Sequence, residues 1–527
     1  MLETQGDQWD GDLACHNSFL SPVGTKQNGT HNVHVEEAKT APLFSVDVAR
    51  RVESAPGAVF PQYGLLAKNL AICDPKAETD WLTGAPVTSD KRIFLNVNAP
   101  FSAFICGSQG SGKSHTLSCM LEASLMESRL GKLPRPLTGI VFHWDKHTAV
   151  ARHQPCEAAY LCSSEIPVTV LVSPSNFWAM KQAYENLPGL DRGARRPVVR
   201  PLLFRQKHLN VDRMMTLMSI DTENGHVALY TEVIHRILRQ MAMSGVGASG
   251  LDYPKFRAEL KAQNLFSSQN TSLEMRFQLL ESFIDGLSET YGVKCFEERM
   301  PEKLNPQKWT TEQIKKRKEQ PDMWTPEPGS LTIVDLSDPF VNENSACALF
   351  DICLSLFLEN HRAGGTILAL DEAHKFLSGS DYSLAFTESL VSVIRLQRHY
   401  GARIIIATQE PTISPKLLDL CSMTIVHRFN SPNWMATLKG HLAGVSHQGH
   451  GSSERNTDEI FNTIVSLDAG QALLFSPSAM LEISESTTNS SSEAATIKKL
   501  GLRYVKMRVR QRLTTDGGRS LMAASAA

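Results

Sequence analysis

A glycine-rich segment early in the chain has the residue types and spacing of a phosphate-binding loop. Residues 107–114, GSQGSGKS, match the pattern GxxxxGK[ST] in full. Glycines allow backbone angles that turn successive N–H groups toward phosphate oxygens. The lysine can reach the β- and γ-phosphates of a nucleoside triphosphate, and the serine hydroxyl is a ligand for Mg²⁺. We therefore expect ATP and Mg²⁺ to be bound by Gly107, Ser108, Gln109, Gly110, Ser111, Gly112, Lys113, Ser114 and His115.

Two acids follow an apolar run much later in the chain. Asp371 and Glu372 come directly after Thr366–Leu370. An acid at the carboxyl end of a buried parallel strand faces the crevice where such sheets bind ligands. We expect Asp371, with Ser114, to hold Mg²⁺, and Glu372 to polarise the attacking water. Acids in this position are also common helix caps, so the prediction depends on the upstream loop.

A glutamine ends the next apolar run. Gln409 follows Ile404–Thr408, where its side chain could contact the γ-phosphate or the attacking water and report hydrolysis. A polar residue at a strand end is commonplace, and the order after the acidic pair is what favours this role.

The letters of residues 371–374, DEAH, also match the name of a group of RNA helicases. Those helicases keep this motif much closer to the phosphate loop, and they carry a Ser-Ala-Thr motif and a Gln-Arg-x-Gly-Arg box that this sequence lacks. We therefore expect His374 to be an ordinary residue of the turn.

Short apolar runs recur between helical patterns from about residue 92 onward. Runs of this kind are typical of strands buried on both faces, and their alternation with helices predicts an α/β fold: a parallel sheet with helices on both faces. The runs are Ala103–Cys106, Gly139–Phe142, Val168–Val172, Leu331–Val334, Thr366–Leu370, Arg403–Thr408, Thr424–Val426 and Ala472–Phe475.

Changes in composition divide the chain into six expected parts. They are a disordered N-terminal arm (1–40), a small irregular or β-rich preamble (41–91), the first part of an ATPase core (92–175), a large, mainly helical insertion (176–328), the second part of the core (329–481), and a Ser/Thr-rich linker with a basic C-terminal strand and tail (482–527).

The composition is that of an ordinary globular protein. Of 527 residues, 42% are hydrophobic and 20% are charged, and the net charge of −2 gives no overall attraction to nucleic acid. The ten cysteines contain no CxxC pair, which argues against a zinc or thioredoxin-like site. The sequence shows no secretory signal and no apolar stretch long enough to span a membrane. We expect an intracellular protein of the cytoplasm or nucleus.

The order of these motifs resembles the HerA/FtsK superfamily of ring-forming, DNA-pumping ATPases. The resemblance implies a parallel P-loop NTPase sheet (RecA/ASCE-like), a homo-oligomer expected to be a hexamer, and a sensor role for Gln409, which joins Lys113 and Glu372 as the expected catalytic residues. It also implies an arginine finger for a neighbouring subunit's ATP, with Arg398 as first choice and Arg395 as second. The matching segments are Gly107–Ser114, Gly329–Ser337, Thr366–Phe376, Arg395–Leu420, Thr424–Phe429 and Gly470–Pro477.

Three basic clusters could contact the phosphates of double-stranded DNA. Charge runs are also commonly solvated surface, and a charged edge strand can serve only to block aggregation. Two functions therefore stay open: a motor that translocates DNA, or an ATP-dependent switch or assembly ATPase that acts on a protein partner. The clusters are Arg192, Arg195, Arg196, Arg200 and Arg205; Lys315–Lys318; and Lys506, Arg508, Arg510 and Arg512.

Overall fold

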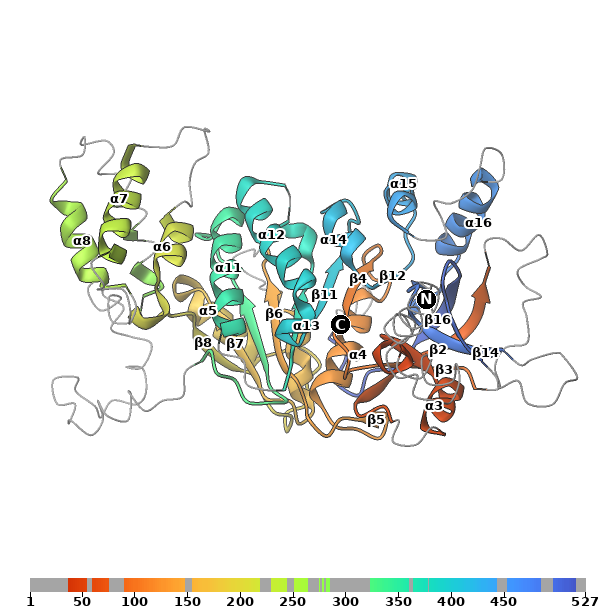
Figure 1. Cartoon of the computed structure of the whole chain (residues 1–527). Helices are drawn as coiled ribbons and strands as arrows, with labels where there is room; N and C mark the ends of the chain where they lie inside the picture. The colour runs from red at the N-terminus through yellow and green to blue at the C-terminus, as the bar shows by residue number, and fades with distance from the viewer. Residues whose placement is uncertain are drawn as a thin grey trace, which may run out of the picture.

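The computed structural model shows a long twisted sheet with helices along it (Figure 1). It describes residues 37–54, 59–74, 90–146, 154–218, 229–243, 251–263, 274, 277–278, 281–284, 323–359, 364–377, 379–442, 453–484 and 496–517. Most of the N-terminal arm, the run 315–318 and most of the Ser/Thr-rich linker lie outside these ranges.

The central part of the sheet is parallel. It confirms the predicted α/β fold, because its strands coincide with seven of the eight apolar runs and β8 continues it at one edge. In spatial order these strands are β12 (Met423–Val426), β4 (Ser102–Cys106), β11 (Ala402–Thr408), β10 (Thr366–Leu370), β6 (Thr138–His143), β9 (Leu331–Asp335), β7 (Val168–Val172) and β8 (Val198–Pro201).

An extension that is mostly antiparallel continues the sheet beyond β12. It joins strands from both ends of the chain, since β16 pairs with β2 along their length. The preamble and the C-terminal strand thus lie side by side, and the latter is placed next to the core. The order is β13 (Gln471–Phe475), β16 (Tyr504–Val509), β2 (Tyr63–Cys73), β3 (Arg92–Leu95), β1 (Leu43–Ser45), β14 (Met480–Ser484) and β15 (Thr496–Lys499), with β5 (Gly131–Lys132) on β2.

Both faces of the parallel sheet are covered by helices, as the sequence predicts. Along β11, Ile404 and Ile406 belong to one apolar core, whereas Ile405 and Ala407 belong to the other. This alternation follows from the opposite directions of successive side chains in a strand. The first core includes α11 (Glu343–Glu359), α12 (Asp381–Arg395) and α14 (Pro415–Leu420); the second includes α4 (Lys113–Leu125), the 3-10 helix η2 (Glu157–Ser163) and α5 (Phe177–Glu185).

The described part of the insertion is mainly helical, with β8 as its strand. Apart from α5, its described helices lie beyond the β8 end of the sheet (Figure 1). They are α6 (Val211–Met218), α7 (Leu229–Met243) and α8 (Tyr253–Lys261). The remaining α-helices among the described residues are α3 (Val46–Glu53), α13 (Gln397–Tyr400), α15 (Pro432–His441) and α16 (Ser453–Val465), and further 3-10 turns there are η3 (Pro174–Asn176), η4 (Gln206–His208) and η7 (Ala373–Lys375). Among the helices that the structure describes, none has both the length and the apolar character required to cross a bilayer.

Candidate nucleotide-binding and hydrolysis site

The phosphate loop leaves the carboxyl end of β4 and leads directly into α4. Two glycines are required by its geometry. A Cβ at Gly107 would lie 2.7 Å from the Cβ of His427, and Gly112, the N-cap of α4, has a φ of 111°. The loop is also fastened to the chain after β12, since the N–H and the hydroxyl of Ser108 both donate to the carbonyl of Arg428, at 2.9 and 2.8 Å. This context of strand, loop and helix is the one that the motif requires.

Lys113 is the first residue of α4 and is only 5% exposed. Its Nζ donates to the carbonyl of Ser108 at 3.0 Å, so the ammonium group lies across its own loop. Burial lowers the pKa of Lys113, while the charges of Glu372 and Asp371 act in the opposite direction. The ammonium group is therefore electrostatically linked to the acidic pair, although the two segments are far apart in the sequence.

A buried histidine holds the loop helix against the neighbouring strands. His427 Nδ1 lies 3.0 Å from the carbonyl of Gln471 on β13, and Nε2 lies 2.9 Å from the hydroxyl of Thr116 on α4. A carbonyl can only accept, so Nδ1 carries the proton and Nε2 accepts from Thr116. Burial lowers the pKa of His427 to about 4, which keeps the ring neutral near pH 7.

Asp371 lies at the carboxyl end of β10, separated from β4 only by β11. One side of its carboxylate is held, because Oδ2 accepts from the Sγ of Cys156 at 3.6 Å and lies 3.8 Å from Nδ1 of His143. Within the part of the chain that the structure describes, the other oxygen, Oδ1, is buried with no hydrogen-bond partner. A buried carboxylate oxygen without a partner fits an oxygen ligand for Mg²⁺.

Glu372 has a left-handed backbone, with φ of 53° and ψ of 43°. It is the sole non-glycine residue with positive φ among the described residues. Such a conformation costs about 1–2 kcal/mol, and strain of this kind is concentrated at functional sites. The carboxylate accepts from Nε2 of Gln409 at 2.8 Å, so the structure brings together two residues predicted to act on the attacking water.

The expectation that His374 is only a turn residue is incomplete. Its Nδ1 lies 3.5 Å from Oε2 of Glu372, and it accepts the main-chain N–H of Gln409 at 3.4 Å. Burial lowers the pKa of His374, which favours the neutral ring that can accept this bond. His374 therefore helps to fix the relative positions of Glu372 and Gln409.

Two residues at the site have no counterpart among the predicted catalytic and nucleotide-binding residues. The carboxylate of Glu157 in η2 interacts with the side chain of Ser114. The same carboxylate accepts from Nη1 of Arg512 at 2.7 Å. Burial raises the pKa of Glu157 to about 7. The sequence carries no motif around Glu157, and it places Arg512 in a surface cluster.

The C-terminal cluster of four cations is in fact divided between two environments. Arg508 is exposed and Lys506 is half-buried on β16, whereas the side chains of Arg510 and Arg512 are 7% and 2% exposed. Arg510 pairs with the buried Glu122 of α4, at 2.7 Å. The prediction of one cationic face is therefore wrong for Arg510 and Arg512, because the chain turns inward after β16 ends.

Other predicted residues lie at the rim of the site or away from it. Gln109 and Gly110 are exposed in the loop, and His115 points toward the C-terminal segment, with Nε2 2.8 Å from the carbonyl of Arg510. Arg398 and Arg395 are both exposed, just before the amino end of β11. They therefore lie at the amino end of β11, whereas the phosphate loop lies at the carboxyl ends of the strands.

No protein-family model and no curated protein sequence matches the chain. Several solved structures are similar to parts of it, including the following two. One is VirB4 of Thermoanaerobacter pseudethanolicus, at 11% identity over 85% of this chain and 96% of that one, with a TM-score of 0.45. The other is the genome packaging NTPase B204 from Sulfolobus turreted icosahedral virus 2 in complex with ATP-gammaS, at 17% identity over 29% and 64%, with a TM-score of 0.21. At these values the fold class rests on the strand order of this chain, and its function on its own side chains.

Proposed function

We propose that this chain is a Mg²⁺-dependent P-loop ATPase. The observation that carries the proposal is that three segments meet at the carboxyl ends of the parallel strands. The phosphate loop after β4, Gln409 after β11 and the acidic pair after β10 all follow the carboxyl ends of three adjacent parallel strands. A strained acid hydrogen-bonded to a glutamine, beside a buried lysine, is suited to hydrolysis as well as to binding.

The residues have separate tasks in the proposed reaction. Lys113 leaves the carbonyl of Ser108 to pair with the β- and γ-phosphates, and the N-terminus of α4 adds positive potential there. Ser114 and Asp371 would hold Mg²⁺, which supplies neutralising charge on the phosphate oxygens when bound. Glu372 accepts a proton from the attacking water, and Gln409 orients the carboxylate that does so.

The arginine finger would have to act between subunits. Arg398 precedes the amino end of β11, whereas the γ-phosphate of its own site would lie at the carboxyl end. The seven residues of β11 span about 20 Å at roughly 3.3 Å per residue, farther than an arginine side chain reaches. The proposal therefore includes an oligomer, with a hexamer expected, in which Arg398 serves the neighbouring ATP.

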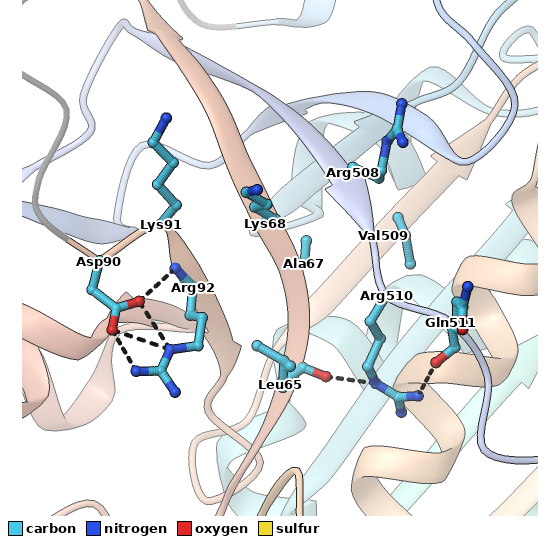
Figure 2. A pocket seen from close by; sticks show the side chains of 10 residues that line it. All are labelled: Leu65, Ala67, Lys68, Asp90, Lys91, Arg92, Arg508, Val509, Arg510 and Gln511. Carbon is cyan, nitrogen blue, oxygen red and sulfur yellow. Dashed lines mark hydrogen bonds and ion pairs between the residues drawn. The ribbon is translucent and has the colours of Figure 1, made fainter.

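We further propose double-stranded DNA as the polymer on which the ATPase acts, and a basic cleft on the antiparallel extension as a contact site. The cleft has a volume of about 590 Å³ and is lined by β2, the start of β3 and the end of β16. Figure 2 shows Lys68 between Lys91 and Arg508, whereas Asp90, the acid in the lining, pairs with Arg92. Such a surplus of cations suits a phosphate backbone.

DNA is expected to stimulate ATP turnover several-fold, and the double variant Lys68→Ala/Lys91→Ala is expected to lose this stimulation. Each lost phosphate contact lowers the slope of log K against log salt by about 0.9, so the double variant should lose about two from the slope. Turnover with and without DNA and a salt titration of DNA binding measure both effects. Lys498→Ala/Lys499→Ala, two exposed lysines on β15, is the matched control. If DNA has no effect on the wild type, the substrate is a protein partner instead.

The variant Arg398→Ala is expected to bind ATP normally but to lose about 100-fold or more in turnover, the low end of what arginine fingers contribute. Mixing it with Glu372→Gln provides the decisive readout. The Arg398→Ala subunit keeps Glu372, and the Glu372→Gln subunit keeps Arg398. At half of the interfaces between unlike subunits an intact Glu372 therefore faces an intact Arg398, so mixed oligomers should regain activity that neither variant has alone. Full activity of Arg398→Ala alone, with Arg395→Ala inactive, would transfer the role to Arg395.

A further inference from the structure

The last described segment of the chain is firmly docked on the phosphate-loop helix. Glu122 of α4, with a side chain that is 0% exposed, accepts from the main-chain N–H groups of Leu513 and Thr514 at 3.1 and 3.0 Å. It also accepts from the hydroxyl of Thr514 at 2.6 Å and from Nη1 of Arg510 at 2.7 Å. These hydrogen bonds to one buried carboxylate hold the segment after β16 against α4.

This docking carries Arg512 to the nucleotide site. Its side chain is 2% exposed, and its Nη1 donates to Glu157 Oε1 at 2.7 Å. A second acid, Asp516, lies 3.6 Å away and is half exposed. Nη2 of Arg512 is buried without a hydrogen-bond partner in the described part of the chain. Burying a guanidinium is costly unless it is paired and hydrogen-bonded, and here Glu157 supplies the pairing.

Glu157, the partner of Arg512, lies beside Ser114, a predicted Mg²⁺ ligand. Cys156, the residue before Glu157, donates its Sγ to Oδ2 of Asp371 at 3.6 Å, which places the start of η2 beside this predicted ligand. Glu157 also interacts with the side chain of Ser114, and its charge acts on both Asp371 and Lys113. Glu157 therefore lies on the same side of the loop as the two predicted ligands. Mg²⁺ prefers oxygen ligands and usually keeps several waters, which need carboxylate acceptors around them.

We propose that Glu157 is a second carboxylate of the Mg²⁺ site, beside Asp371, and that Arg512 is the positioning residue that holds it there from the C-terminal segment. The inference depends on the proposed Mg²⁺–ATP site. Glu157 contacts Ser114, so its carboxylate can reach the cation or accept from a water bound to it. Arg512 balances the charge of Glu157 and fixes its orientation, which is a common task of groups behind a metal ligand.

The test measures metal binding rather than turnover, on the full-length chain. Mn²⁺ replaces Mg²⁺, and the free Mn²⁺ signal in electron paramagnetic resonance is titrated in the presence of ADP. Loss of a supporting group typically costs 10–100-fold in metal affinity. We expect Glu157→Gln and Arg512→Ala each to weaken Mn²⁺ binding about 10-fold, Arg512→Lys to restore part of the loss, and metal-free binding of a fluorescent ADP to stay unchanged.

A matched ion pair elsewhere gives the control. Arg503 and Glu482 form a partly buried pair on the antiparallel extension. Arg503→Ala and Glu482→Gln should leave Mn²⁺ affinity at the wild-type value. Thermal unfolding of each variant, with Glu157→Asp as a more conservative change, separates metal binding from folding.

The outcomes distinguish this inference from the function on which it depends. If wild-type protein binds no nucleotide, the proposed function fails. If wild-type protein binds Mn²⁺–ADP and Glu157→Gln binds it equally well, this inference alone is overturned. A loss of metal-free nucleotide binding in Glu157→Gln, with Mn²⁺ affinity otherwise unchanged, would assign the pair a purely structural role and would also overturn it.

Discussion

The variant Lys113→Ala is expected to lose at least about 100-fold in affinity for Mg²⁺–ATP. A charge-assisted hydrogen bond contributes about 1.5–3 kcal/mol, and about 1.4 kcal/mol corresponds to tenfold in affinity, so the loss of two such bonds to the phosphates accounts for this factor. The substitution has a second effect in this structure. Lys113 is the cation whose charge acts together with those of Asp371 and Glu372. Without it, the acids repel an incoming triphosphate.

Equilibrium titration with a fluorescent ATP analogue in the presence of Mg²⁺ measures the loss. Lys261→Ala is a suitable control because this lysine is exposed on α8, at the end of the molecule away from α4 (Figure 1). The melting temperature should be compared as well, since Lys113 is buried and holds the carbonyl of Ser108. Affinity within twofold of wild type in a folded variant would contradict the assignment of residues 107–114 as a phosphate cradle.

The parallel core could be predicted from the sequence because its signals are local. A strand buried on both faces produces a continuous apolar run, and each predicted run from Ala103–Cys106 to Ala472–Phe475 lies in the sheet. The direction of each strand could not be predicted in the same way. Ala472–Phe475 has the same texture as the others, yet β13 is antiparallel to β12. An apolar run indicates that a strand is buried on both faces but not in which direction it runs. The change from parallel to antiparallel pairing at β13 could therefore not be predicted.

The site divides in the same way into local and non-local parts. Lys113, Asp371 and Gln409 belong to short motifs at strand ends, where type and position suffice for a prediction. Arg512 reaches the site only because β16 pairs with β2 and the next residues turn onto α4. Alternating cations and apolar residues after residue 504 describe a surface strand equally well. The sequence therefore assigned Arg512 to a basic face, and Glu157, whose partner was unknown, had no signal at all.

The variant Glu372→Gln is expected to bind ATP with wild-type affinity and to hydrolyse it about 100- to 1,000-fold more slowly. A positioned general base contributes about 10²–10⁴-fold, and an amide of the same shape cannot accept the proton of water. The side chain is well placed for this task, because Gln409 fixes one carboxylate oxygen at 2.8 Å and the left-handed backbone fixes its direction. An amide at 372 preserves size and keeps an oxygen that can accept from Gln409, so little of the binding site should change.

Single-turnover hydrolysis of radiolabelled ATP measures the chemical step apart from product release, and filtration of the complex shows whether uncleaved ATP stays bound. Glu388→Gln on α12, an exposed glutamate paired with Lys416, is the matched control and should behave as wild type. A Glu372→Gln enzyme that cleaves ATP within threefold of the wild-type rate would show that another group accepts the proton. The backbone strain at 372 would then need a different explanation, since strain of about 1–2 kcal/mol is retained only where the surrounding structure imposes it.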